Sequence, residues 1–561
     1  MDQNTSCSDF HLLRRFLCLG SKESVFRTHI QHSKFSRNDV PFIERLIEGG
    51  QGKDVLDCIK DVSESNGACR QGPTVFSYAF CIVHGDREVK KYGYNMLTNI
   101  CRIPTHLFEF QKFCEELNMQ KSNHSGWGRS HRMGISKWYN SFANNAPKLA
   151  YLVTKYKKRS KWSHRDIVRL AHVKPQNERI RTILKFIVNK EMEDVITLHD
   201  SLEVDDRDDK IVKEQKEQHK KVKIFLRAVI EAKECDDKER IMDLIGVQDL
   251  AREHVPNRFL SDKEVWRVLL RTMPPTAMIR NIGKMTKLGM FDDAKASNFI
   301  SIVKGKMQSE LLQDFGVHPL RILFALKQYK EGKGDQGKLV WDPNQEIISI
   351  LEKAFYDTVD LQPRTEKRYL LAVSVSGDMK KKLIGSPLTA SEATCAMILT
   401  IVKQGNRVET LLFENKCNPE QSFVSSIDRN DNLKSIKAKL DSFTSQSGER
   451  QTPFPSWSRK NSNSFDVIIF FTDTLTGEGA GRVTEPFIHC CHMVGTPNHV
   501  RIIVAMTSKP NDPVNAVEPC DDQTLHVIGF DPSTPQIINT FIDGYMYNNA
   551  LRASMEGIEE Y

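Results

Sequence analysis

Apolar residues in the first two-thirds of the chain recur three and four positions apart, which is the period of an amphipathic helix. Segments with this period include VPFIERLIEG (40–49), DKEVWRVLLRTM (262–273) and HPLRILFALKQY (318–329). Glycines and prolines such as Pro274-Pro275 separate the segments, and strand-like runs are scarce. This pattern predicts a helical-repeat domain over residues 1–362, with helices packed in pairs as in an α-solenoid.

The pattern changes near Lys367, where short β-rich runs begin to alternate with helical segments. The predicted strands are Tyr369–Ser376, Arg407–Phe413, Asp466–Phe471, Arg501–Ala505 and Thr524–Phe530. The polar, Ser-rich segment Thr444–Ser464 is predicted to be a loop. Strand–helix alternation predicts a doubly wound α/β domain with a mostly parallel sheet over residues 367–548, followed by a C-terminal tail at 549–561. Ligands of such sheets bind at the carboxyl ends of the strands, here Ser374–Asp378 and Thr472–Asp473.

Composition places this chain among ordinary globular proteins. It has 561 residues, of which 39% are hydrophobic and 27% charged, so we expect at least two domains and no extensive disorder. The first twenty residues lack the apolar core of a signal peptide, and no apolar run reaches the roughly 18 residues of a membrane span. The 13 cysteines are irregularly spaced, which favours reduced thiols. We expect no membrane association and a cytoplasmic location, with an additional nuclear pool as the alternative.

Positive charge is concentrated in one stretch, Lys155–Lys185, here called the basic segment. It contains 11 Lys and Arg residues and two acids, whereas the whole chain has a net charge of only +8. Tyr156, Trp162, His164 and His172 are interleaved with the cations. Cations neutralise phosphates, and aromatic rings and imidazoles can stack on bases or bond to them. A solvated helix face is the alternative, although such faces tend to mix both signs of charge.

The basic segment also carries a resemblance. KYKKRSKWSHRDIVRLAHVKP (155–175) is similar to the Ro ribonucleoprotein autoantigens, the proteins that carry the TROVE module. Further family-like segments follow in family order: RRFLCLGS (14–21), ICRIPTHLF (100–108), GWGRSHRMGISKWY (126–139), EVWRVLLRTMPPTAMIRNIGKMT (264–286) and HPLRILFALKQYKEGKG (318–334). RYLLAVSVSGDM (368–379) resembles the start of the family's von Willebrand factor A domain.

The resemblance implies a ring of HEAT-like helical repeats beside an A domain. It implies binding of small structured Y RNAs on a basic outer face, and of misfolded RNAs such as 5S rRNA precursors partly through the ring, in RNA quality control. The family's outer-face contacts match Lys155, Arg159 and His172. Lys155 and Arg159 are four residues apart, so we expect them on one side of a helix. Taken alone, His172 would instead be a buried residue that caps a helix before Pro175.

Other basic residues are candidates for the same RNA-binding role. They are Lys157, Lys158, Lys161, His164, Arg165, Arg169, Lys174, Arg129, Arg132, Arg280 and Lys284. Helix packing explains Arg280 and Lys284 equally well, because apolar residues of core type surround them.

A metal site is suggested at the end of the first predicted strand. A domains of this kind bind Mg²⁺ through Asp-x-Ser-x-Ser, helped by a Thr and an Asp from later loops. Here Ser374 replaces the leading Asp and Asp378 replaces the last Ser, with Ser376 retained between them and Asp473 as the later acid. Glu449 or Thr452 stands near the place of the Thr. We expect Ser376, Asp378 and Asp473 to bind a divalent cation poorly.

Motifs for other activities are weak. GEGAGR (477–482) lacks the Lys-Ser/Thr of a phosphate loop, and HCCHM (489–493) lacks a second ligand pair at zinc spacing, so helix packing explains it better. No nucleophile elbow or HExxH motif is present. We therefore expect no enzyme, but a monomeric RNA-binding protein that also meets RNA-processing proteins. The alternative is a metal-independent protein–protein scaffold that works through the A domain.

Overall fold

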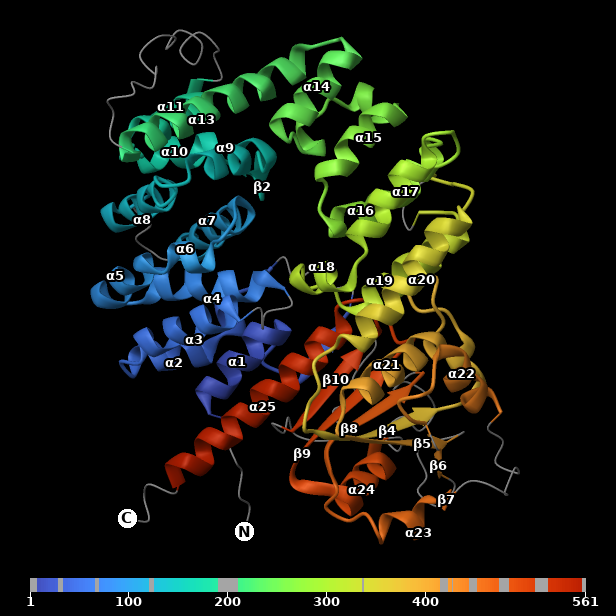
Figure 1. Ribbon diagram of the computed structural model, residues 1–561. Coiled ribbons are helices and arrows are strands. Elements are labelled where there is room, and N and C mark those ends of the chain that lie inside the picture. The colour runs from blue at the N-terminus through green and yellow to red at the C-terminus, as the bar shows by residue number, and fades with distance from the viewer. Residues whose placement is uncertain are drawn as a thin grey trace. The chain divides into compact units, whose positions relative to one another are not determined.

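The computed structural model describes residues 8–28, 34–65, 70–120, 126–189, 210–334, 338–413, 422–425, 427–442, 452–473, 484–509 and 523–556. The chain divides into two compact units. The helical unit comprises residues 32–273, and the sheet unit comprises residues 1–31 and 274–561. Figure 1 labels the helices and strands of both units.

The described part of the helical unit consists mainly of helices. Its α-helices are α2 (Pro41–Glu48), α3 (Gly52–Glu64), α4 (Gln71–His84), α5 (Arg87–Asn95), α6 (Leu97–Ile100), α7 (Pro104–Met119), α8 (Arg129–Asn140), α9 (Ala146–Lys155), α10 (His164–Ala171), α11 (Glu178–Asn189), α13 (Lys210–Glu234), α14 (Lys238–Gln248) and α15 (Lys263–Thr272). Its 3₁₀ turns are η1 (Arg37–Asp39), η2 (Arg252–His254) and η3 (Asn257–Ser261), and its one described hairpin joins β2 (Lys158–Arg159) to β3 (Trp162–Ser163).

These helices pack mainly on helices close to them in sequence, as expected for helical repeats. α4 contacts α3, α5 and α7, and α13 contacts α9, α11 and α14. Every residue of α4 from Pro73 to Val83 is buried, which makes it a central element of this unit. Proline occupies the first turn of α2, α7 and α9, where its missing N–H leaves no helical hydrogen bond unmade.

The sheet unit combines a sheet with helices from both ends of the chain. Its elements are α1 (Asp9–Leu19), β1 (Val25–Arg27), α16 (Pro275–Lys287), α17 (Ala296–Lys306), α18 (Ser309–Asp314), α19 (Pro319–Glu331), α20 (Gln345–Asp360), β4 (Arg368–Ser374), η4 (Gly377–Lys380), α21 (Ala390–Gln404), β5 (Arg407–Phe413), β6 (Phe423–Ser425), α22 (Leu433–Asp441), β7 (Thr452–Pro453), α23 (Phe454–Ser458), β8 (Phe465–Thr472), α24 (Thr484–Val494), β9 (Gly495–Ala505), β10 (Thr524–Ile528) and α25 (Thr534–Glu556).

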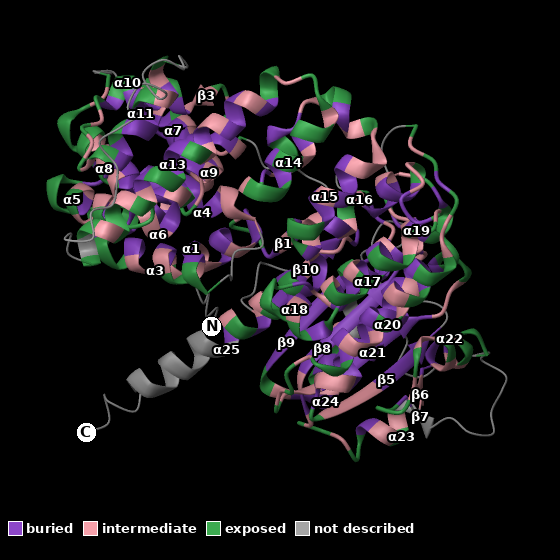
Figure 2. Ribbon diagram, turned by 45° about the horizontal axis from the view of Figure 1, so that its top comes forward, coloured by how far each residue is buried: buried purple, intermediate pink, exposed green. Residues whose placement is uncertain are grey.

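The sheet has the strand order β1-β10-β9-β8-β4-β5-β6-β7. All pairs are parallel except β5–β6 and β6–β7. The five predicted strands correspond to β4, β5, β8, β9 and β10, and the prediction of a doubly wound α/β domain is confirmed. The central strands are apolar on both faces, because helices cover each side of a parallel sheet (Figure 2).

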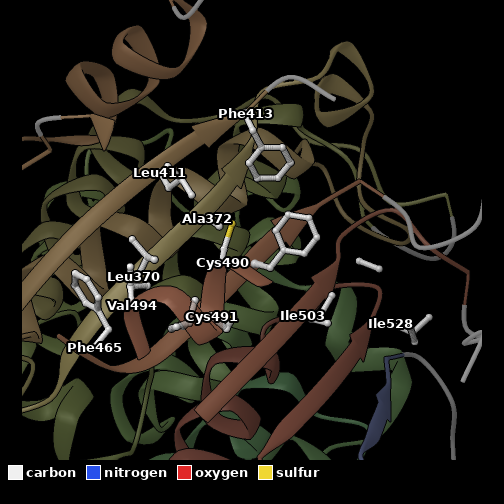
Figure 3. Packing of buried hydrophobic residues seen from close by; sticks show 13 residues of the cluster. Leu370, Ala372, Leu411, Phe413, Phe465, Cys490, Cys491, Val494, Ile503 and Ile528 are labelled. Carbon is white, nitrogen blue, oxygen red and sulfur yellow. The ribbon is translucent and has the colours of Figure 1, made fainter. Parts of the chain in front are cut away.

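One face of the sheet forms a buried cluster with α24 (Figure 3). Leu370 and Ala372 of β4 and Phe470 of β8 are at most 1% exposed there, because alternate residues of a strand share a face. Cys490 and Cys491 of α24 belong to the same cluster. The two cysteines are therefore packing residues, as expected, while the flanking His489 is exposed.

The loop predicted at Thr444–Ser464 is wrong in part. The described residues of that stretch include β7 and the short helix α23. β7 pairs with β6, so hydrogen bonds to a partner strand organise a polar segment that has no strand pattern of its own. The predicted tail at 549–561 also begins inside a helix, since α25 continues to Glu556.

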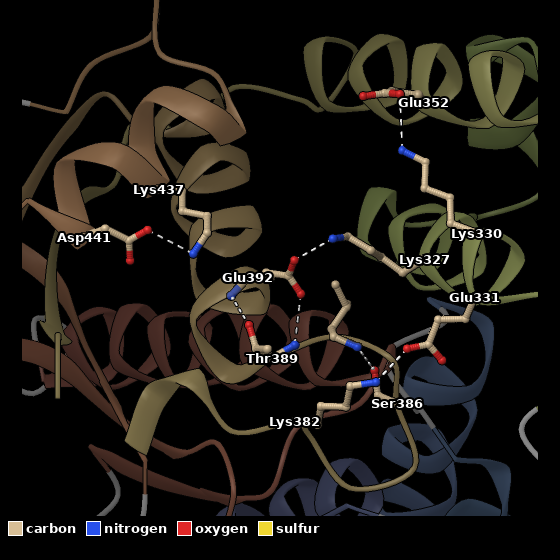
Figure 4. A network of polar contacts seen from close by, with 11 residues as sticks. Lys327, Lys330, Glu331, Glu352, Lys382, Ser386, Thr389, Glu392, Lys437 and Asp441 are labelled. Atoms are coloured by element: carbon tan, nitrogen blue, oxygen red, sulfur yellow. Dashed lines mark hydrogen bonds and ion pairs between the residues drawn. The ribbon is translucent and has the colours of Figure 1, made fainter. Parts of the chain in front are cut away.

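Ion pairs join α19 to the first turn of α21 and to the segment that precedes it (Figure 4). Lys327 Nζ lies 2.5 Å from Glu392 Oε1, and Lys382 Nζ lies 2.6 Å from Glu331 Oε1. Glu392 also accepts from the Thr389 backbone N–H, 3.1 Å away, in the capping box of α21. The compact sheet unit therefore crosses the predicted boundary at 362–367, and that boundary stays a prediction.

No described helix is both long enough and apolar enough to span a membrane.

Candidate nucleic-acid interface

The basic segment begins at the end of α9 and continues through the β2–β3 hairpin into α10. Lys158 pairs with Ser163 and Arg159 with Trp162 across the hairpin. Ser160 and Lys161 at its turn have φ angles of 52° and 69°, the left-handed conformation that a type I′ hairpin turn requires at both central positions. The hairpin leaves Lys157, Lys158, Arg159 and Lys161 exposed.

Lys155 ends α9, whereas Arg159 lies on β2. The expectation that these two residues share one side of a helix is therefore wrong. Four-residue spacing brings side chains together only while the helix continues, and α9 stops at Lys155.

The Lys155 side chain is held by two tyrosines. Its Nζ donates to the Tyr151 hydroxyl at 3.2 Å and lies 5.2 Å and 5.6 Å from the ring centroids of Tyr151 and Tyr156. Burial disfavours the ammonium, but the hydrogen bond to Tyr151 and electrostatic interactions with both tyrosines and with Glu253 raise the pKa of Lys155. Lys155 therefore remains a cation although it is half-buried. Its contacts with the two tyrosines hold the side chain in place.

Arg159 is oriented by an acid from another helix. Its Nε donates to Glu109 Oε1 of α7 at 3.0 Å, and its side chain remains 58% exposed. The pair fixes the guanidinium through one nitrogen, while the exposed remainder faces solvent. Such an arginine is suited to a bidentate contact with a phosphate.

α10 carries the rest of the segment's central charges. Ser163 caps it in a capping box with Asp166, and Arg165 and Arg169 are exposed one helical turn apart. His172 caps its C-terminus in the left-handed conformation, with φ of 49°. His172 caps through its backbone, but its side chain is exposed, which contradicts the alternative of a buried residue.

His164 does not belong to the surface. It is 3% exposed, its Nδ1 lies 2.8 Å from the Tyr139 hydroxyl, and its ring packs 4.8 Å from the Phe108 ring. Burial lowers the pKa of His164 to about 3, so it is neutral at neutral pH. Its prediction as an RNA contact is corrected: it follows the N-cap of α10 and points into the core.

The other predicted basic residues fall in three places. Lys174 is exposed just after α10, and Arg129 and Arg132 are exposed in the first turn of α8. Arg280 and Lys284 lie on α16, in the sheet unit.

Arg280 and Lys284 line a cavity of about 640 Å³ in the sheet unit. Arg321 of α19 lines it too, and Phe324 and Phe530 stack in its wall with centroids 6.4 Å apart. No ion pair joins any of these three cations to another residue that the structure describes. Sequence reasoning missed Arg321, whose only signal is a charge between the core residues Leu320 and Ile322.

The suspected metal residues gather at the carboxyl ends of neighbouring strands. Ser376 and Asp378 follow β4, and Asp473 follows β8, which pairs with β4. The Ser376 hydroxyl is buried without a described hydrogen-bond partner, but Asp378 pairs with Lys381 at 2.9 Å. Glu449 and the Thr452 side chain lie outside the described residues, as does the whole of 477–482.

Lys381 brings a cation of its own to this position. The hydrogen bond and charge of Asp378 raise the pKa of Lys381, and Asp473 contributes in the same direction. Lys381 thus pairs with Asp378 and is also influenced by the charge of Asp473, and the leading Asp is absent. This donor set fits poorly with the octahedral oxygen shell that Mg²⁺ requires.

Comparison with known proteins accounts for nearly the whole chain. The TROVE domain model matches residues 3–328. The chain belongs to the TROVE family. The Ro60 vWA domain model matches residues 368–542, which contain the described strands β4–β10.

Curated relatives match over almost their full lengths. A Caenorhabditis elegans protein named RNA-binding protein RO60 is 31% identical over 583 residues, covering 96% of this TROVE-family chain and 88% of the relative. A Deinococcus radiodurans protein of the same name is 25% identical over 540 residues, covering 96% and 93%. The crystal structure of the Deinococcus radiodurans RO (RSR) protein matches with a TM-score of 0.77 at 24% identity, covering 96% of this chain and all of that one. The structural match supports the predicted fold class of helical repeats plus an A domain.

Proposed function

We propose that this protein binds structured RNA through the basic segment. The proposal rests on the run of exposed cations in the basic segment. The few acidic side chains in this segment already have partners within the protein. Asp166 is used in the capping box of α10, and Glu178 pairs with Arg181. The segment therefore keeps a local excess of positive charge, which attracts phosphates and releases their counterions. The relatives named RNA-binding protein support the same function.

A triple variant tests the assignment of Lys155, Arg159 and His172. Lys155→Ala, Arg159→Ala and His172→Ser together should lower affinity for a small stem-containing RNA by about 100-fold or more, because contacts from charged donors are each worth about 1.5–3 kcal/mol. The measurement is filter binding or fluorescence anisotropy with the full-length protein.

A matched control separates this effect from loss of charge in general. Lys53→Ala, Arg87→Ala and Lys91→Ala remove three exposed cations from α3 and α5. This control should change affinity less than about threefold, the scale of a screened surface charge. Equal losses in the two triple variants, or unchanged affinity in the first, would contradict the site assignment.

We further propose that the bound RNAs are Y-type small RNAs and misfolded non-coding RNAs, and that binding serves RNA quality control. The family resemblance of the basic segment supports this finer statement. Crosslinking in cells followed by sequencing of the bound RNAs tests it. Recovery of messenger RNA fragments without enrichment of small structured RNAs would contradict it.

A further inference from the structure

A second cavity, of about 330 Å³, lies in the helical unit between α5, α7 and the first turn of α8. Its volume falls in the range of about 300–1,000 Å³ that is typical of small-molecule sites. We propose that this cavity takes one unpaired nucleotide of a bound RNA, with the base inside and the phosphate at the mouth. The proposal rests on the RNA-binding function and names a second subsite for it.

The floor of the cavity is a pre-organised polar network. The Tyr94 hydroxyl lies 2.9 Å from His131 Nδ1, and His131 Nε2 lies 2.7 Å from Gln111 Oε1. Because the Gln111 oxygen can only accept, Nε2 carries the proton and Nδ1 accepts from Tyr94. Gln111 Nε2 then donates to Glu115 Oε1 at 3.2 Å. The network fixes the amide and carboxylate orientations before any ligand arrives.

Packing makes this floor rigid. Gly134 of α8 lies so close to α5 that a Cβ there would come within 2.3 Å of the Tyr94 ring. Any larger residue would push α8 away from Tyr94 and separate the tyrosine from His131. Burial lowers the pKa of His131 to about 4, so the ring is neutral at neutral pH and keeps the hydrogen-bond pattern described above.

An aromatic wall suits the flat face of a base. Trp127 lines the cavity, and its Nε1 donates to Glu115 Oε1 at 2.8 Å, which fixes the indole plane. Bases stack on such rings regardless of sequence, with a contribution of about 1–3 kcal/mol per base. Trp127 also lies 5.8 Å from Trp162, measured between ring centroids, so the cavity adjoins the hairpin that carries Arg159.

Two cationic side chains at the cavity are suited to bind a phosphate. Lys90 of α5 and Arg129 of α8 both line it, and neither forms an ion pair with a residue in the described ranges. Gly128 at the N-cap of α8 supplies no side-chain cap, so the first backbone N–H groups of that helix add to the positive potential. The cavity thus combines an aromatic wall and a polar floor, which suit a base, with two cations, which suit a phosphate. This combination matches a nucleotide better than a free base or a free phosphate.

The first experiment titrates the full-length protein with the four nucleoside 5′-monophosphates, using calorimetry. We expect saturable binding that Arg129→Gln weakens about tenfold or more, since this change removes a charge-assisted hydrogen bond to the phosphate. Arg87→Gln is the matched control, because Arg87 is exposed on α5 beside the cavity but does not line it. It should leave the affinity within about twofold, as expected for a screened surface charge.

The second experiment compares an RNA duplex that has a one-nucleotide bulge with the same duplex without it. The bulged RNA should bind more tightly, and Arg129→Gln should remove that advantage while Arg87→Gln retains it. The triple variant of Lys155, Arg159 and His172 should weaken both RNAs by the same factor and leave monophosphate binding unchanged. Failure of the RNA-binding function would appear as no effect of that triple variant.

Absence of monophosphate binding together with no advantage for the bulged duplex would overturn the cavity proposal by itself. Equal effects of Arg129→Gln and Arg87→Gln would also overturn it, because they would indicate general surface charge. Thermal melting of each variant, expected at the wild-type temperature, excludes misfolding as the cause.

Discussion

At the scale of single residues, the same residue type performs opposite tasks along the basic segment. His172 is exposed and available to a ligand, whereas His164, eight residues earlier, is 3% exposed and packs on Phe108 and Tyr139. Both were candidate RNA contacts, and only their surroundings distinguish them. A charged group is favoured at the surface, whereas burial without a counter-charge favours the neutral ring.

His164 makes the stability of the protein depend on pH. Its pKa is about 3 in the folded state against 6.5 as the ordinary value. The unfolded chain therefore binds more protons as the pH falls below 6.5. His164 therefore makes its full contribution to the free energy of unfolding above pH 6.5. This contribution decreases as the pH falls towards 3, by at most about 1.4 kcal/mol per pH unit.

Urea unfolding at pH 7 and pH 5 measures this effect. His164→Gln should reduce the difference in unfolding free energy between the two pH values by up to about 2 kcal/mol. His172→Gln, at an exposed position, is the control and should leave that difference unchanged. A wild-type pH dependence retained in His164→Gln would show that other groups cause it.

Lys381 allows a second prediction about single residues. Its ammonium pairs with Asp378 and is further stabilised by the charge of Asp473, so we expect the wild-type melting temperature to be insensitive to added MgCl₂ or EDTA. Lys381→Ala leaves the two carboxylates unbalanced, and Mg²⁺ should then raise the melting temperature of the variant. Lys380→Ala, an exposed neighbour, should behave as wild type. Tight Mg²⁺ binding by the wild type in calorimetry would contradict this account.

At the scale of elements, the N-terminal strand β1 is part of the sheet although no sequence pattern predicts it. Val25, Phe26 and Arg27 pair with His526, Val527 and Ile528 of β10. Thr28 Oγ1 also donates to the Ile528 carbonyl oxygen at 3.0 Å. Three residues are too few to show a period of two, so only the partner strand makes them a strand.

Phe26 should therefore be important for the stability of the sheet unit. It is fully buried, and Phe26→Ala should lower the unfolding free energy by about 3–5 kcal/mol through reduced burial and a new cavity. The measurement is the urea midpoint of the full-length protein. Glu23→Ala, at an exposed position in the preceding loop, should leave the midpoint unchanged. A small effect of Phe26→Ala would mean that β1 is dispensable for the sheet.

At the scale of the whole molecule, charge is unevenly distributed. The net charge is +8, and the basic segment alone has nine more Lys and Arg residues than acids, 11 against two. The remainder of the chain is thus nearly neutral, and RNA association should be governed by one local field. Such binding depends steeply on salt, because condensed counterions are released from each neutralised phosphate.

Affinity for structured RNA should fall by about 10³–10⁵ between roughly 50 and 200 mM salt if about 6–10 phosphates are neutralised. The slope of log affinity against log salt concentration measures this number. In the variant with Lys155→Ala and Arg159→Ala the slope should decrease by about two units, one for each phosphate that the protein no longer neutralises. A slope near zero for the wild type would exclude phosphate binding as the main source of affinity.

Much of the architecture is already determined by the sequence. The five main strands were predicted because short β-rich runs alternate with helical segments, and the long helices because a period of 3.6 residues reports which side of a helix is buried. The basic segment was visible for a similar reason, since charge counting needs no tertiary contact. The roles of β1, β6, β7 and α23 were not predictable, because those short elements take their form from hydrogen bonds to a partner strand or from packing beside one.

Only the tertiary structure decided how the basic segment presents its charges. Sequence spacing placed Lys155 and Arg159 on one helix, but α9 ends at Lys155 and a tight hairpin carries Arg159 to Glu109 of α7, fifty residues away. It also decided that His164 is a core residue and that Trp127, Arg129 and Lys90 share a cavity. Periodicity and charge are properties of neighbouring residues, whereas burial and the walls of a cavity depend on which distant segments pack together.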